Sequence, residues 1–193
     1  MQTSTPTQYS KFGQIIKKVL HTKVGAFIGY HAGISGFNRI DATVILSSGK
    51  VKKLSPSYNS RVSVGAALNA SLISGTTLGG ISTPLPAKYI ALSTSVLTPA
   101  MGDTTLSGET AVSGLARALG TSGTYTAPVA LDGAASYVLT KTFTAGVTGP
   151  TTIQSAAIFD AVSTGNMFVE ANLSSSATLA LNDQLIINWT INL

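Results

Sequence analysis

Histidines, cysteines and clustered acids are the side chains that most often bind metals or catalyse reactions, and this chain has few of them. The only two histidines are His21 and His31, ten residues apart and without a group of acids near them. A structural zinc site needs about four converging ligands, and the sequence has no cysteine to supply thiolates. We therefore expect no bound metal and no cofactor.

Nucleophilic catalysis is not indicated either. Serine is abundant, but the sequence lacks the Gly-x-Ser-x-Gly motif that presents a nucleophilic serine on a sharp turn. Gly49 and Lys50 lack the upstream glycine of a phosphate-binding loop. We expect no catalytic residue and no enzymatic activity.

The densest basic cluster consists of Lys50, Lys52 and Lys53. A nucleic-acid site would be expected to combine such lysines with aromatic residues or a known motif, and Tyr58 is the only aromatic residue nearby. A nucleic-acid partner is therefore not expected. Two interpretations stay open: a solvated hairpin tip, which is commonly charged, or a contact with an acidic patch on a neighbouring protein.

A second candidate interaction segment lies near the N-terminus, after a polar arm over residues 1–10. Its apolar residues have the i, i+3, i+4, i+7 spacing of an amphipathic helix, and its lysines lie off that face. A lone helix of about ten residues is not stable in water and needs a surface to fold on. That surface is either the core of its own domain or a neighbouring subunit. In the second case the contact residues are Phe12, Ile15, Ile16 and Val19, together with Lys17 and Lys18.

Charge is sparse and unevenly distributed. Charged residues make up 10% of the chain, against about a quarter in an average globular protein. Up to Arg61 there are nine lysines and arginines and one acid, whereas the remainder has three basic and six acidic residues. This asymmetry indicates different partners for the two parts, or pairing between subunits. The most apolar N-terminal stretch, residues 19–37, is interrupted by His21, Lys23 and His31, so we expect no membrane partner.

The elements that would carry such a surface are mostly β-strands. Residues 184–193 alternate strictly, with Trp189, the only tryptophan, central on the apolar face. The same period predicts strands over residues 89–94, 137–145, 151–160 and 167–173. A polar turn at 163–166 joins the last two strands into a hairpin. We expect loops at 97–107, where Asp103 bonds backbone amides, and at 174–177, while residues 109–119 fit either a helix or a strand.

The first half of the chain is predicted to contain fewer and shorter elements. A glycine-interrupted strand is expected over residues 24–30, and a hairpin over 39–47 and 51–54. An alanine-rich helix is expected over 61–74, followed by a Gly/Thr/Pro linker at 75–86. These features divide the chain into an arm and helix at 1–23, a hairpin and helix region at 24–80, and a β domain at 81–193. In the alternative, residues 24–193 form one domain. The fold class is mainly β: an antiparallel β-sandwich or jelly-roll-like domain with a short N-terminal arm and helix.

Six segments of the second half form an ordered series. They are YIALST at 89–94, TPAMGDTTL at 98–106, FTAGV at 143–147, TTIQSAAIFDA at 151–161, GNM at 165–167 and DQLIINWTI at 183–191. Together they resemble a family of small β-rich virion proteins of tailed bacteriophages, in which YIALGTG, EAGLFDA and DTLTITWTI are typical. The chain departs from that pattern where Ser155 stands in place of the glutamate and Ala157 in place of the glycine. The resemblance also favours a strand near Arg117.

This resemblance implies a structural protein, with no catalytic residue to carry over. We expect a capsid decoration (cement) protein that stabilises the shell by oligomeric assembly, located in the virion and assembled in the bacterial host cytoplasm. The alternative is a tail component, such as a baseplate, tail fibre or receptor-binding protein. The expected partners are other copies of the chain in a homotrimer, and the major capsid protein or another virion protein.

Overall fold

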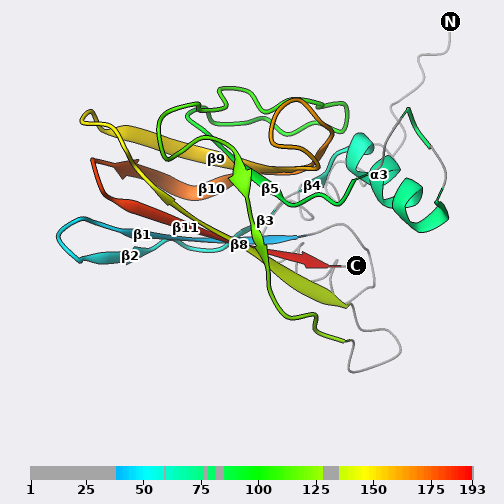
Figure 1. The fold of residues 1–193 in the computed structure, drawn as a ribbon, viewed down its shortest axis with the longest axis horizontal. Helices are drawn as coiled ribbons and strands as arrows, with labels where there is room; N and C mark the ends of the chain where they lie inside the picture. Colours follow the sequence, from blue (N-terminus) through cyan, green and yellow to red (C-terminus); the bar gives the residue numbers. More distant parts are fainter. Residues whose placement is uncertain (1–37, 59, 76–77, 81–84, 128–134, 193) are drawn as a thin grey trace, which may run out of the picture.

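The computed structural model describes residues 38–192, apart from 59, 76–77, 81–84 and 128–134. The described chain folds into two antiparallel sheets that pack face to face, which confirms the predicted β-sandwich (Figure 1). The first sheet has the strand order β2-β1-β11-β8-β7, with β3 also paired to β1. Its strands are β1 (Arg39–Ile45), β2 (Val51–Lys53), β3 (Ser57–Tyr58), β7 (Thr121–Ser122), β8 (Ser136–Thr144) and β11 (Gln184–Asn192).

The second sheet has the order β4-β10-β9-β5-β6 and lies above the first in Figure 1. Its strands are β4 (Ser60–Arg61), β5 (Tyr89–Ser93), β6 (Ala118–Leu119), β9 (Thr151–Phe159) and β10 (Met167–Leu179). The helix α3 (Ser63–Ser74) follows β4 directly and contacts β10. In each sheet, a strand that precedes residues 75–86 in the sequence pairs with a strand that follows them. In the first sheet β1 pairs with β11, and in the second β4 pairs with β10.

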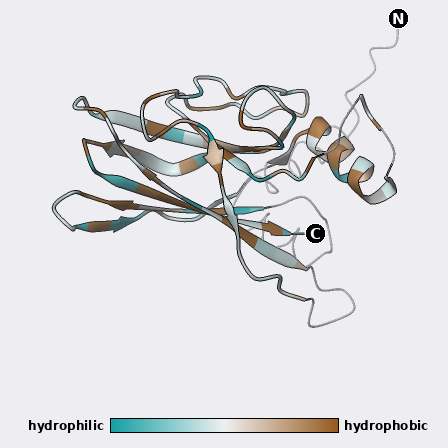
Figure 2. Cartoon of the chain, viewed as in Figure 1, coloured by the Kyte–Doolittle hydropathy of each residue, from teal (hydrophilic) through white to brown (hydrophobic). Residues whose placement is uncertain are grey.

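Strand β11 is the centre of the first sheet. Every second residue of β11 is buried, as the alternating sequence predicts. The register places Trp189 between Ile40 of β1 and Leu139 of β8, and all three side chains are buried. Figure 2 shows hydrophobic and hydrophilic segments alternating along the strands. The buried segments meet those of the second sheet in the main core.

Strand β10 is longer than predicted. The expected surface loop at residues 174–177 is wrong, because these residues continue the strand, which pairs with β9 as far as Leu179. The pairing register shifts between Asn172 and Ala177, so the strand carries an irregularity there. A bulge of this kind lets the polar residues Ser174, Ser175 and Ser176 remain exposed while Ala177 returns to the core.

The second sheet also carries a smaller apolar cluster on its outer side. The cluster consists of Val62, Ala91, Leu97, Leu106, Ala157, Phe159 and Met167, and we refer to it as the outer cluster. Leu97 and Leu106 belong to a long loop that runs over this side of the sheet, and Val62 precedes α3. The helix approaches closely at Gly65, where a Cβ atom would lie 2.0 Å from the carbonyl oxygen of Phe168. A side chain at position 65 would therefore push α3 away from β10.

Most of the predicted elements are present with shifted ends. The helix begins at Ser63 rather than at residue 61, and it ends at Ser74 before Gly75 in the left-handed conformation. The hairpins β1–β2 and β9–β10 and the strand at residues 89–93 are confirmed. Asp103 accepts a hydrogen bond from the Ala100 amide (2.6 Å), as predicted for its loop. The predicted N-terminal arm, its helix and the strand at residues 24–30 lie outside the described residues.

Candidate functional site

The structure places the predicted basic cluster on the β1–β2 hairpin. The turn closes through hydrogen bonds from the Leu46 amide to the Lys50 carbonyl (2.9 Å) and from the Gly49 amide to the Leu46 carbonyl (2.8 Å). Gly49 has a φ of 82°, a conformation that glycine adopts at little cost. Lys50, Lys52 and Lys53 are all exposed, and Val51 between them is 54% exposed. We refer to residues 50–53 as the basic hairpin.

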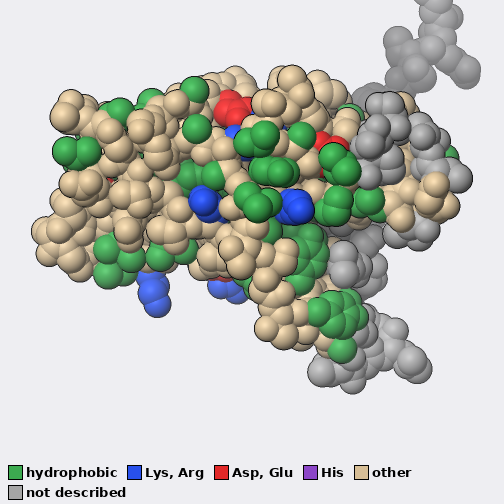
Figure 3. Space-filling view, in the orientation of Figure 1, with side chains coloured by type: hydrophobic (Ala, Val, Ile, Leu, Met, Phe, Trp, Pro, Cys, Tyr) green, Lys and Arg blue, Asp and Glu red, His purple; other side chains and the backbone are tan. Residues whose placement is uncertain are grey.

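The basic hairpin lies at a free edge of the first sheet. Strand β2 pairs only with β1 among the described strands, and it stands last in the strand order. Lys53 is opposite Thr43 and Lys52 is opposite Val44, so the two lysines alternate between the faces of the sheet. Figure 3 shows Lys and Arg side chains projecting from the lower border of the molecule, on the side where Figure 1 places β1 and β2.

The other predicted interaction residues cannot be related to this hairpin in space. Phe12, Ile15, Ile16, Val19, Lys17 and Lys18 lie outside the described residues, as do His21 and His31. Among the residues that the structure does describe, no group of three or more potential metal ligands comes together. No helix in the described ranges is long and apolar enough to cross a bilayer.

The acids of the described chain are almost all engaged within the protein. Asp41 receives two hydrogen bonds of 2.8 Å from Arg39, which raise the pKa of that arginine. Asp160 accepts bonds from the amide and side chain of Asn166 (2.6 and 2.7 Å). Asp183 accepts bonds from the Ala180 and Ser47 amides (2.9 and 2.5 Å), which lower its pKa.

The lysines, unlike the acids, have no charged partner within the described part of the chain. Both ion pairs between described residues involve arginines, and none involves Lys50, Lys52, Lys53, Lys88 or Lys141. The charge that this part of the protein offers to a partner is therefore positive, and the basic hairpin is its most concentrated part.

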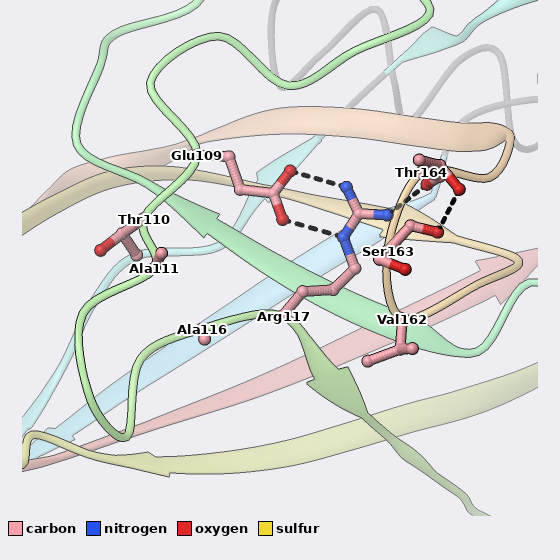
Figure 4. A pocket seen from close by; sticks show the side chains of 8 residues that line it. All are labelled: Glu109, Thr110, Ala111, Ala116, Arg117, Val162, Ser163 and Thr164. Atoms are coloured by element: carbon pink, nitrogen blue, oxygen red, sulfur yellow. Dashed lines mark hydrogen bonds and ion pairs between the residues drawn. The ribbon is translucent and has the colours of Figure 1, made fainter.

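A hollow that the sequence did not predict lies around Arg117 (Figure 4). It has a volume of about 530 Å³ and is lined by Glu109, Thr110, Ala111, Ala116, Arg117, Val162, Ser163 and Thr164. The guanidinium forms a fork with Glu109: Nε donates to Oε1 (2.8 Å) and Nη2 to Oε2 (2.6 Å). The remaining nitrogen, Nη1, donates to the carbonyl oxygens of Ala161 (3.1 Å) and Thr164 (2.6 Å).

These contacts connect two loops and leave Arg117 little hydrogen-bonding capacity for a ligand. Every nitrogen of Arg117 has a partner, its side chain is only 9% exposed, and the side chain rests on the ring of Phe159. Four of the five N–H donors of this guanidinium have partners within the protein, so it has little capacity to bind an external anion. We therefore assign the pair a structural role. No periodicity in the sequence points to it. Glu109 forms an isolated β-bridge with Ser93, Arg117 stands directly before β6, and the two meet only through the folded loops.

The comparisons with known proteins give one family. A family model described as "Podophage GP4 fiber I protein gp80" matches residues 64–190, about two thirds of the chain. The matched region begins in α3 and ends in β11, so it includes the second sheet except β4, and the strands β7, β8 and β11 of the first. A search of the curated proteins finds no match.

Proposed function

We propose, from the fact that the chain belongs to the podophage GP4 fiber I protein gp80 family, that it is a structural component of a podophage tail fibre and has no enzymatic activity. The family is one of phage virion proteins, and the chain is accordingly a virion structural protein of the fibre type. The observation that carries the proposal is the extent of the match, which takes in most of the sandwich.

Capsid decoration is the second candidate. The low charge content, with 10% charged residues, suits a surface that neighbouring subunits cover, whether on the head or on the tail. The family description favours a fibre, so we place the tail component first. In both cases assembly takes place in the host cytoplasm, and multivalent attachment to the particle multiplies a modest affinity of each copy.

We propose the basic hairpin as an attachment surface for an acidic segment of another virion protein. An extended segment that added to the free edge of β2 would meet Lys52 on one face and Lys53 on the other. Acidic side chains on both faces of that segment would satisfy these lysines. The described chain does not offer such a segment itself, because its acids are bonded internally or buried.

The same lysines also restrict how copies of the chain associate. Pairing of two β2 edges would bring like charges together, which opposes a contact of that kind. We propose a homotrimer that forms through other surfaces, and sedimentation equilibrium of the purified chain measures its stoichiometry. A trimer whose contacts leave β2 free fits this proposal, whereas pairing of copies through β2 contradicts it.

The location on the particle can be tested directly. A phage whose copy of this chain carries a short C-terminal peptide tag is decorated with gold-labelled antibody and examined by electron microscopy. A fibre protein places the gold at the tail, whereas a decoration protein distributes it over the head. Absence of gold from intact particles, with the tagged chain present in the lysate, contradicts both candidates.

The role of the basic hairpin can be tested with a charge-neutral variant, Lys50→Gln, Lys52→Gln and Lys53→Gln. Exposed ion pairs contribute about 0.2–1 kcal/mol each, so losing three of them should weaken incorporation into particles roughly tenfold in apparent affinity. Its control is Lys88→Gln with Lys141→Gln, which removes unpaired lysines elsewhere. Equal incorporation of the triple variant and the wild type at low salt contradicts this attachment surface.

A further inference from the structure

Asp183 is a buried acid that joins three parts of the chain at one end of the sandwich. It stands directly before β11, in the turn that follows β10. Its two carboxylate oxygens, Oδ1 and Oδ2, accept hydrogen bonds from the Ser47 and Ala180 amides (2.5 and 2.9 Å). Its backbone carbonyl accepts a further bond from the amide of Ala145, the residue after β8 (2.9 Å). Asp183 therefore connects the β1–β2 turn to the ends of β8 and β10.

The β1–β2 hairpin extends beyond the first sheet at the point where Asp183 stands. The register pairs Ile45, the last residue of β1, with Gln184, the first residue of β11, so residues 46–50 continue past the end of β11. Strand β2 has only three residues and pairs with β1 alone among the described strands. A short two-stranded ribbon of this kind is marginally stable in water without further support.

The hydrogen bond from Ser47 to Asp183 provides such support. Within the described chain, it is the one hydrogen bond that joins residues 47–53 to a segment outside the hairpin. Its acceptor is a carboxylate, which is ionised at neutral pH, so the bond is stronger than one between neutral groups. Leu46, the residue before Ser47, packs against the main core. The turn is therefore held both by packing and by a charged acceptor.

The position of this turn decides which backbone groups of β2 face outward. The Lys50 carbonyl and the Leu54 amide both form hydrogen bonds with the β1 side of the hairpin (2.9 Å each). In an antiparallel ladder, the residues between two such positions direct their N–H and C=O groups to the opposite side by turns. The backbone groups at the free edge are therefore those of Val51 and Lys53.

We propose that Asp183 is a positioning residue for the basic hairpin, an inference that rests on the attachment surface proposed above. By holding Ser47, it keeps the outward backbone groups of Val51 and Lys53 aligned for hydrogen bonds with an acidic strand of another virion protein. The lysine side chains meet the acids of that strand on its two faces. Because the edge is in place before binding, association does not carry the entropy cost of ordering it.

Two variants remove this support in different ways. Asp183→Asn keeps the size of the side chain, but an amide has only one oxygen and cannot accept from both Ser47 and Ala180. Ser47→Pro removes the donating N–H and leaves Asp183 unchanged. The Gly49 amide donates to the Leu46 carbonyl and Gly49 is left-handed, which is the geometry of a type I turn with Ser47 in its second position. Proline is favoured at that position, so the turn itself should survive.

The matched control is Asp160→Asn. Asp160 is also buried and accepts hydrogen bonds from the amide and the side chain of Asn166 (2.6 and 2.7 Å), but it lies in the turn at the other end of β10. Its replacement removes similar bonds without reaching the hairpin. The triple variant of Lys50, Lys52 and Lys53 described above tests the attachment surface itself.

Amide hydrogen exchange of the full chain, followed by NMR at neutral pH, reports on the hairpin. The amides of Leu46, Lys52 and Leu54 face the β1 side and should be protected in the wild type. In Asp183→Asn and Ser47→Pro we expect them to exchange at least about tenfold faster, the factor that corresponds to one hydrogen bond to a charged group. In Asp160→Asn their exchange should stay at the wild-type rate.

Binding is measured with a synthetic oligoglutamate peptide at low salt. In the wild type this peptide should slow exchange of the Val51 and Lys53 amides, and Asp183→Asn and Ser47→Pro should bind it roughly three- to tenfold more weakly. Unchanged exchange of Lys52 in both variants overturns the positioning role. Wild-type affinity of both variants overturns it too, provided that the triple lysine variant has lost affinity. If the triple lysine variant itself binds like the wild type, the attachment surface is wrong, and this failure is distinguishable because the exchange rates do not depend on a partner.

Discussion

The guanidinium of Arg117 lies over the ring of Phe159, with Cζ 3.5 Å from the ring centroid. The same guanidinium binds Glu109 and two carbonyl oxygens of the loop that follows Phe159. Arg117 thus connects the turn before β6 with the β9–β10 loop, through both stacking and hydrogen bonds.

Replacing Arg117 by leucine should destabilise the protein. Breaking a buried ion pair by removing one partner costs about 3–5 kcal/mol. Because the carboxyl of Glu109 is 28% exposed and can regain water, we expect a loss of about 2–3 kcal/mol. Urea unfolding of the two proteins at neutral pH measures the difference.

The matched controls are Glu109→Gln and Arg117→Lys. Glu109→Gln leaves Arg117 its stacking and two carbonyl partners, so the loss should be only about 1 kcal/mol. In Arg117→Lys the charge is kept but the two-pronged contact with Glu109 cannot form. Its loss of unfolding free energy should lie between those of Glu109→Gln and Arg117→Leu. If Arg117→Leu unfolds within 0.5 kcal/mol of the wild type (about the size of a surface substitution), the pair does not hold the loops.

The stability contributed by Asp183 should depend on pH. Hydrogen bonds from the Ala180 and Ser47 amides lower its pKa below 3.8. A group with a lowered pKa stabilises the fold above its unfolded pKa and loses that contribution as pH falls through the folded value. Asp183→Asn should therefore be less stable than the wild type at pH 7, and the difference should shrink below about pH 4.

Thermal unfolding at pH 7, 4 and 2.5 measures this difference. Asp41→Asn is a suitable control, because Asp41 is bound to an exposed arginine rather than to backbone amides. A difference between Asp183→Asn and the wild type that is the same at all three pH values would show that the charge of Asp183 contributes nothing.

Trp189 should be the most sensitive position of the main core. It is fully buried between Ile40 and Leu139, so Trp189→Ala should cost about 3–5 kcal/mol. Trp189→Phe keeps an aromatic ring and removes an indole Nε1 that has no hydrogen-bond partner among the described residues. Trp189→Phe should lower the free energy of unfolding by less than half as much as Trp189→Ala. Equal unfolding midpoints for Trp189→Ala and the wild type would exclude this position as a core anchor.

The N-terminal segment gives a prediction that the described structure does not test. If residues 1–20 attach the protein to the particle, their deletion should leave a folded, soluble domain that no longer incorporates. Binding of the intact protein should then weaken with added salt, because three lysines lie in the segment. If the segment instead covers the domain's own core, the shortened protein should unfold or aggregate. Circular dichroism and particle incorporation distinguish these outcomes, and wild-type incorporation of the folded truncation contradicts attachment.

The sequence predicts the sandwich because apolar and polar residues alternate along most strands, and this alternation separates the buried face of each strand from its exposed face. In β11 the inward residues are apolar and the outward residues are largely polar, so the strand and its buried face follow directly. Strand β10 is different. Glu170 and Asn172 fall on the face that alternation assigns to water, yet the loop of residues 97–106 lies over that face. Alternation cannot show that a loop some seventy residues earlier in the chain covers a sheet.

The Arg117 pair was not predicted for a related reason. It depends on the conformation of turns, including positive φ values at Gly108, Gly114 and Gly165, and such turns have no period. The basic hairpin was predicted, because its lysines are adjacent in sequence and the turn at Gly49 is local. Local signals therefore identify the exposed candidate surface, while the contacts between distant loops require the folded structure.

The central place of β11 also governs when the protein can fold during its synthesis. Residues 184–192 lie between β1 and β8, so the first sheet has a vacant position until they leave the ribosome. A chain that stops earlier exposes two unpaired strand edges and leaves the main core without the four buried side chains of β11. Premature termination should therefore yield products that host proteases remove, so that only copies translated through β11 are available to the growing particle.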